Sequence, residues 1–98
     1  MAVIRTTRFE VAPADVEEMT VRRNALIAAV RNAFPGLTEA RLARVGERVW
    51  IDGWRWESAA SLDAALRAAA TGALPEAGPA FALTGNATAE SAEIVDER

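Results

Sequence analysis

The chain contains no cysteine, histidine, tyrosine or lysine, and these absences exclude several kinds of site. Without cysteine there is no disulfide, no thiolate nucleophile and no sulfur ligand for a metal. Without histidine the commonest general base and metal ligand is missing, and without lysine Schiff-base catalysis is excluded. We therefore expect no metal site.

The charge pattern excludes further classes of partner. The chain has 11 basic residues, all of them arginines, and 14 acidic residues, so its net charge is −3. Positive and negative residues are interspersed along the sequence, without a basic block. This pattern argues against nucleic-acid binding. No apolar run reaches the roughly 18 residues of a membrane span, and the charged start "MAVIRTTRFE" does not resemble a signal peptide. We expect a cytoplasmic protein without a membrane or nucleic-acid partner.

The periodicity of apolar residues predicts one α+β domain over residues 1–98. The expected elements are a strand, a helix, two strands, a helix and a strand, at residues 2–11, 14–34, 37–45, 48–57, 59–71 and 86–97. This β-α-β-β-α-β order is the ferredoxin-like unit, an antiparallel sheet with helices on one face, so the other face would be bare in a monomer. The connection over 73–85 contains Pro75, Gly78 and Pro79 and predicts only a short helical turn at 80–83.

All three tryptophans lie within "RVWIDGWRWES", residues 48–58. Side chains alternate along a strand, so one side should carry Trp50, Asp52, Trp54 and Trp56. Such a side can form the wall of a cavity that holds a planar aromatic molecule. Alternatively, the rings fill the core or a dimer interface. A bulge at Gly53 would turn Trp54 to the other face.

Arg23 falls in the middle of the apolar stripe of the 14–34 helix. A buried guanidinium must pair or reach water. It can pair bidentately with Asp52 on the cavity wall, or it can extend past the helix edge to solvent, which is the alternative we favour. Asn24 and Asn86 could hydrogen-bond a ligand oxygen, although both positions are also typical of an exposed surface.

Three short motifs resemble the antibiotic biosynthesis monooxygenase family: "FPG" at 34–36, "WES" at 56–58 and "SLDAAL" at 61–66. The resemblance extends over roughly residues 2–95. It implies a homodimeric α/β barrel in which each subunit keeps a cavity between its sheet and its helices. Activities in the family include cofactor-free oxygenation of aromatic polyketide intermediates, quinol oxidation and haem degradation.

The chain departs from this family at residues that carry chemistry. Ala65 stands where relatives have a histidine, and Thr7 is near the position of a first-strand asparagine. Haem degradation is therefore disfavoured.

The resemblance implies a homodimeric monooxygenase-like protein that acts, without a cofactor, on a small aromatic substrate of quinol or polyketide type. A non-catalytic ligand-binding or structural barrel is the alternative. The expected catalytic residues are Trp56, Arg23 and Asp52, and the expected substrate-binding residues are Trp50, Trp54, Asn24 and Asn86.

Overall fold

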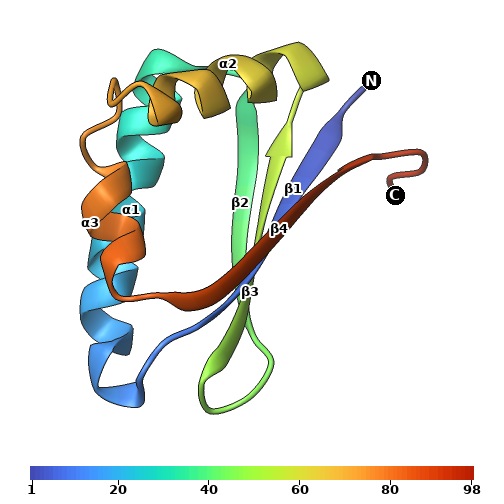
Figure 1. Ribbon diagram of the computed structural model, residues 1–98. Helices are drawn as coiled ribbons and strands as arrows, with labels where there is room; N and C mark the ends of the chain where they lie inside the picture. Colours follow the sequence, from blue (N-terminus) through green and yellow to red (C-terminus); the bar gives the residue numbers. More distant parts are fainter.

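Four strands form one antiparallel sheet, and the helices lie on one of its faces (Figure 1). The computed structural model describes residues 1–98. The strand order is β2-β3-β1-β4, and every neighbouring pair is antiparallel. The predicted ferredoxin-like order is confirmed, with one additional helix. The elements are β1 (Val3–Glu10), the 3₁₀ turn η1 (Pro13–Asp15), α1 (Val16–Ala33), β2 (Leu37–Arg44), β3 (Val49–Trp56), α2 (Ala59–Ala70), α3 (Ala77–Ala82) and β4 (Gly85–Glu93).

Helix α2 begins and ends at local backbone signals. The Ser58 hydroxyl accepts a hydrogen bond from the backbone N–H of Ser61 at 3.1 Å, which caps the first turn. At the other end Gly72 has a φ of 79°, and the N–H of Ala73 donates to the Ala68 carbonyl at 2.9 Å. This reversal needs a left-handed residue, which glycine adopts without steric penalty. The predicted start and stop of this helix are confirmed.

The "FPG" motif brings the start of β2 against the start of α2. Gly36 is buried, and a Cβ atom placed on it would lie 2.7 Å from the Ser61 Cβ. Its carbonyl accepts a hydrogen bond from the backbone N–H of Glu57 at 2.9 Å. The two segments can approach this closely because residue 36 has no side chain. The motif thus fixes how α2 crosses the end of the sheet.

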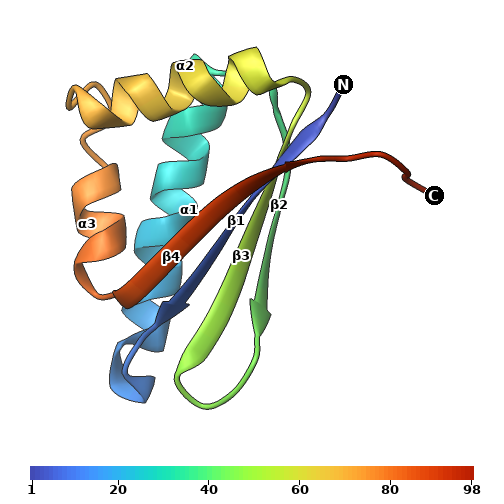
Figure 2. The ribbon, with the colours of Figure 1, turned by 45° about the vertical axis from the view of Figure 1, so that its right-hand side comes forward.

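Helix α3 is longer than the short turn that the sequence predicts. Pro79 lies in its first turn, where a backbone N–H would have no partner within the helix. In Figures 1 and 2, α3 runs beside α1, and the Arg22 guanidinium donates to the Pro79 carbonyl at 3.3 Å. Packing against α1 therefore stabilises a segment whose own sequence favours helix only weakly. None of the helices combines the length and the hydropathy that a membrane crossing requires.

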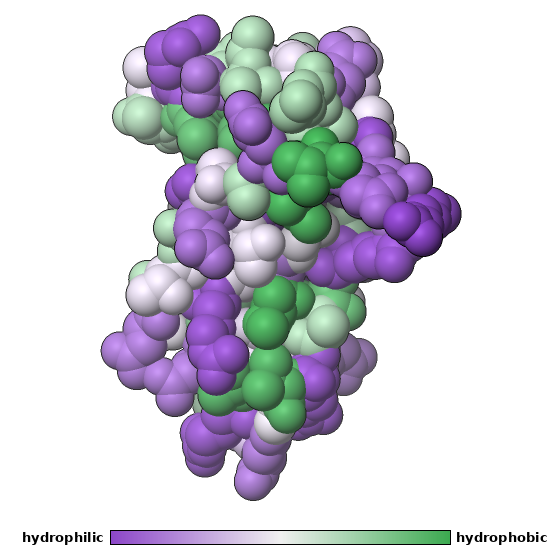
Figure 3. Space-filling model, turned by 90° about the vertical axis from the view of Figure 1, so that its right-hand side faces the viewer, coloured by the Kyte–Doolittle hydropathy of each residue, from purple (hydrophilic) through white to green (hydrophobic).

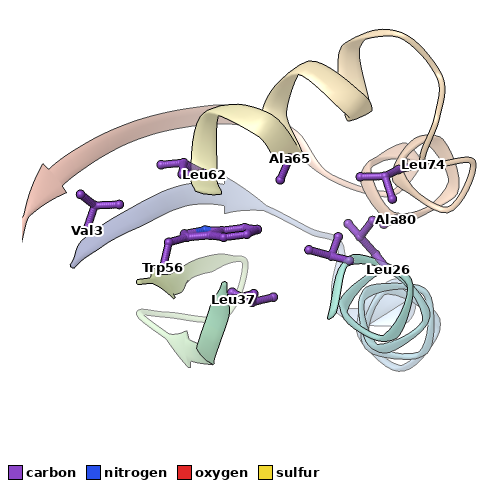
Figure 4. Packing of buried hydrophobic residues seen from close by; sticks show 9 residues of the cluster. Val3, Leu26, Leu37, Trp56, Leu62, Ala65, Leu74 and Ala80 are labelled. Carbon is purple, nitrogen blue, oxygen red and sulfur yellow. The ribbon is translucent and has the colours of Figure 1, made fainter. Parts of the chain in front are cut away.

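The core between sheet and helices has two parts. In the larger cluster, Trp56 lies under α2 and against α1 (Figure 4). The smaller cluster surrounds Met19 on α1. Arg23 lies between them on α1, one turn beyond Met19. The larger cluster consists of Val3, Leu26, Val30, Leu37, Trp56, Leu62, Ala65, Leu74 and Ala80, and the smaller of Phe9, Val11 and Met19.

The second face of the sheet carries no helix, as predicted. Figure 3 shows this side, where hydrophobic groups run down the middle and hydrophilic ones flank them. Ile4 and Ile51 are half-buried there, and every residue of β4 is exposed. Arg55, also on this face, donates to the Glu97 carboxylate at 2.6 and 2.7 Å, and these hydrogen bonds lower the pKa of Glu97. The pair fastens the carboxyl-terminal segment to β3.

Candidate ligand cavity

A cavity of about 290 Å³ lies between the sheet and the three helices. Hydrophobic side chains make up 16 of its 21 lining residues, so it suits an apolar molecule. The volume is close to the lower end of the range of small-molecule pockets, roughly 300 Å³ and above, which restricts the ligand to a compact one. Each surrounding helix contributes to the wall, for example through Leu26 and Val30 of α1, Leu62 and Ala65 of α2, and Ala80 and Phe81 of α3.

The three tryptophans of β3 face the helices, as the alternation predicts. Trp50, Trp54 and Trp56 pair with Phe9, Arg5 and Val3 of β1, and the register between the two strands is continuous. No bulge turns Trp54 away. Only Trp54 and Trp56 line the cavity, however. Trp50 packs on the Met19 cluster, with the Arg44 guanidinium 4.9 Å from its ring centroid.

The indole N–H groups of this strand are buried without an acceptor in the protein. A buried donor left unpaired disfavours the folded state by about 1–3 kcal/mol. For Trp54 and Trp56, which line the cavity, an acceptor on a bound molecule would offset this. The indole N–H of Trp50 is also buried and unpaired, although Trp50 lies away from the cavity. An unpaired N–H alone therefore does not define a ligand site.

An ion pair forms the polar part of the wall. Arg23 Nε donates to Asp52 Oδ2 at 2.8 Å and Nη2 donates to Oδ1 at 2.9 Å, and each side chain is 12% exposed. The prediction that Arg23 extends past the helix edge to solvent is wrong. Asp52 projects from the helix-covered side of β3 toward the gap between the two core clusters, and the bidentate geometry satisfies both charges. Arg23 Nη1 makes no hydrogen bond within the protein.

The two asparagines proposed from the sequence are not among the lining residues. Asn24 is exposed, because it follows Arg23 on α1 and consecutive helical residues point about 100° apart. Asn86 is also exposed, has a φ of 50°, and donates to the Glu10 carboxylate outside the cavity. The structure therefore gathers Trp54, Trp56, Arg23 and Asp52 at one cavity and leaves Trp50, Asn24 and Asn86 outside it.

Two other positions anticipated from the family motifs do lie on the cavity wall. Thr7 and Ala65 line it, where the resemblance implies an asparagine and a histidine. Arg5 and residues within 74–81 also line the cavity, although neither was predicted from the sequence. Strand alternation could have found Arg5, which shares a side with Val3 and Thr7.

Solved structures match the chain along almost its whole length. The cofactor-independent oxygenase SnoaB of Streptomyces nogalater is 25% identical, with a TM-score of 0.72 over 98% of this chain and 95% of that one. The heme-degrader MhuD of Mycobacterium tuberculosis, solved with two hemes in its active site, is 25% identical, with a TM-score of 0.74 over 98% of both chains. No family model matches the chain, and no curated protein matches it in sequence.

A third match carries the name of the family inferred from the motifs. It is a Caulobacter crescentus protein named as a "putative antibiotic biosynthesis monooxygenase", 21% identical, with a TM-score of 0.74 over 97% of this chain and 91% of that one. The fold and the cavity thus define a ferredoxin-like protein of monooxygenase-like architecture. More particularly, the resemblance to the antibiotic biosynthesis monooxygenase family is confirmed.

Proposed function

We propose that the cavity binds a small planar aromatic molecule of quinol or polyketide type and that the protein oxygenates it with O₂, without a cofactor. The apolar cavity walled by Trp54 and Trp56, with an ion pair on its surface, is the observation that carries this proposal. Flat indole surfaces favour a flat aromatic ligand. The similarity to SnoaB, a cofactor-independent oxygenase, supports the reaction class.

The proposed reaction needs little catalytic apparatus. A hydroxyanthrone-type substrate loses a proton, and its anion passes one electron to O₂. The two radicals combine to a peroxide, and loss of water from the peroxide leaves a quinone. One oxygen atom thus enters the product and the other leaves in water. Since the chain lacks histidine and tyrosine, the proton goes to a carboxylate or is lost through the acidity of the substrate.

The cavity residues can assist this reaction in two ways. The apolar wall excludes water and holds the ring in one orientation toward O₂. The free Nη1 of Arg23 can donate to the substrate oxygen that carries the developing anion, while Asp52 keeps the guanidinium in place. In this proposal Arg23 and Trp56 contact the substrate, and Asp52 positions Arg23.

Oxygen uptake with a hydroxyanthrone tests the activity. We expect the protein to raise the rate of oxygen uptake above that in buffer alone. One molecule of quinone should form for each molecule of O₂ consumed. Ala69→Phe, which fills the cavity from α2, should lower the rate severalfold. Ala70→Phe adds the same side chain to the next residue of α2, which is exposed and outside the lining, and should leave the rate unchanged. A rate equal to that of buffer for the unsubstituted protein would remove the enzymatic claim.

The alternative is a protein that binds a ligand without transforming it. The absence of a histidine or tyrosine in the lining favours this candidate. Quenching of tryptophan fluorescence by an anthraquinone, together with no oxygen uptake, would support it. Haem degradation fits poorly, because Ala65 occupies the place where the resemblance implies an iron-ligating histidine, and the chain contains none.

We further propose that the protein is a homodimer joined through the bare face of the sheet. A chain of this size buries only about 60–65% of its unfolded surface alone, so covering this face would add stability. Light scattering should give twice the 10.5 kDa mass of one chain. Ile51→Glu, on the bare face, should give a monomer, whereas Val21→Glu on the exposed side of α1 should not. A stable monomer of the unsubstituted protein would contradict the proposal.

A further inference from the structure

Arg5 differs in burial from every other arginine that lacks an acidic partner. Six arginines form no ion pair with a carboxylate within 4.0 Å. Arg5 alone among them is half-buried, and it lines the cavity. The other five are exposed to solvent and lie outside that lining: Arg8, Arg31, Arg44, Arg48 and Arg67.

The surroundings of Arg5 leave most of its donors free. It lies on β1 between Trp54 of β3 and Ser91 of β4. Its one side-chain hydrogen bond runs from Nη1 to the Ser91 hydroxyl, at 3.2 Å. Nε and Nη2 therefore remain available, and this pair of donors matches the two oxygens of a carboxylate.

The charges of the cavity wall do not cancel. The ionisable lining residues are Arg5, Arg23 and Asp52. Asp52 neutralises Arg23 through two hydrogen bonds, so the remaining positive charge belongs to Arg5. An anion attracted to an apolar cavity is screened less there than in bulk water. A net positive charge in an otherwise apolar space selects an amphiphilic ligand, apolar over its body and acidic at one end.

We infer that Arg5 is the specificity-determining residue of this cavity and that the ligand is an aromatic carboxylate. The carboxylate takes the free Nε and Nη2 of Arg5, and the ring system extends past Trp54 toward Trp56. Ser91 holds the guanidinium toward the ligand from the neighbouring strand. The inference rests on the proposed ligand cavity but not on turnover.

A matched pair of probes tests this inference: anthraquinone-2-carboxylate and the uncharged anthraquinone-2-carboxamide, titrated while tryptophan fluorescence is recorded. We expect the unsubstituted protein to bind the acid about tenfold more tightly than the amide, as a charge-assisted hydrogen bond provides. Arg5→Gln should remove the preference, because it lowers the affinity for the acid more than the affinity for the amide. Arg5→Lys should keep part of it, because the charge remains while the two-donor geometry is lost.

Arg31→Gln is the charge control, since it removes one positive charge from the exposed end of α1 and should keep the preference. Circular dichroism should show that all variants fold. Equal affinity of the unsubstituted protein for acid and amide would overturn the role of Arg5 and leave the cavity proposal intact. A preference that persists in Arg5→Gln would also overturn that role. If neither probe binds, both this inference and the proposed ligand cavity fail.

Discussion

Asp52→Ala should lower the free energy of unfolding by about 3 kcal/mol, because it leaves the Arg23 guanidinium without a partner in an apolar setting. Both side chains are 12% exposed, so solvent compensates little. Urea denaturation followed by circular dichroism measures the effect.

Two further variants separate the charge from the packing. Asp52→Asn keeps the shape but not the charge and should retain only part of the stability, since an amide accepts fewer hydrogen bonds than a carboxylate. In the double variant Arg23→Leu, Asp52→Leu neither charge remains buried, and its stability should return to within about 1 kcal/mol of the unsubstituted protein. A single Asp52→Ala variant as stable as the unsubstituted protein would show that Arg23 reaches water easily after all.

Trp56→Ala should lower the free energy of unfolding by about 4 kcal/mol. The side chain is 2% exposed and lies at the centre of the larger core cluster, so truncation removes its contacts and opens a void next to the ligand cavity. Urea denaturation followed by circular dichroism gives the value. Trp50 and Trp54 remain as fluorescent groups for a second readout.

Trp56→Phe is the conservative counterpart. It keeps an aromatic ring and should reduce stability by less than about 1.5 kcal/mol, but it removes the indole N–H. If that N–H donates to a ligand, the variant will bind an anthraquinone probe several times more weakly than the unsubstituted protein while remaining folded. A loss of under about 1 kcal/mol for Trp56→Ala would contradict a tightly packed ring at this position.

Much of the fold could be predicted because local patterns and tertiary packing agree. The alternation in "VWIDGWRW" places the tryptophans on the helix side of β3, and their pairing with β1 confirms it. Ser58 and Gly72 delimit α2 as predicted, because the Ser58 hydroxyl caps its first turn and Gly72 adopts the left-handed conformation that ends it. Such features depend on neighbours a few residues away, which the sequence displays directly.

The cavity was harder to predict because its walls come from segments far apart in the chain. Helix α3 closes one side, yet its own residues include Pro79 and Gly78, and contacts with α1 and with the core stabilise it. The choice between solvent and Asp52 for Arg23 depended on the distance between α1 and β3, which no periodicity encodes. Arg5 shows the opposite case, since alternation alone indicates its side of the sheet.

Strand β4 is one of the two free edges of the sheet within one chain, the other being β2, and such an edge can recruit a strand from another molecule and begin aggregation. Its sequence, GNATAESAE, has no large apolar side chain and carries Glu90 and Glu93. Two copies that approached along this edge would bring like charges together and gain little apolar burial. The strand that borders the cavity therefore also disfavours association through its own edge of the sheet at high concentration.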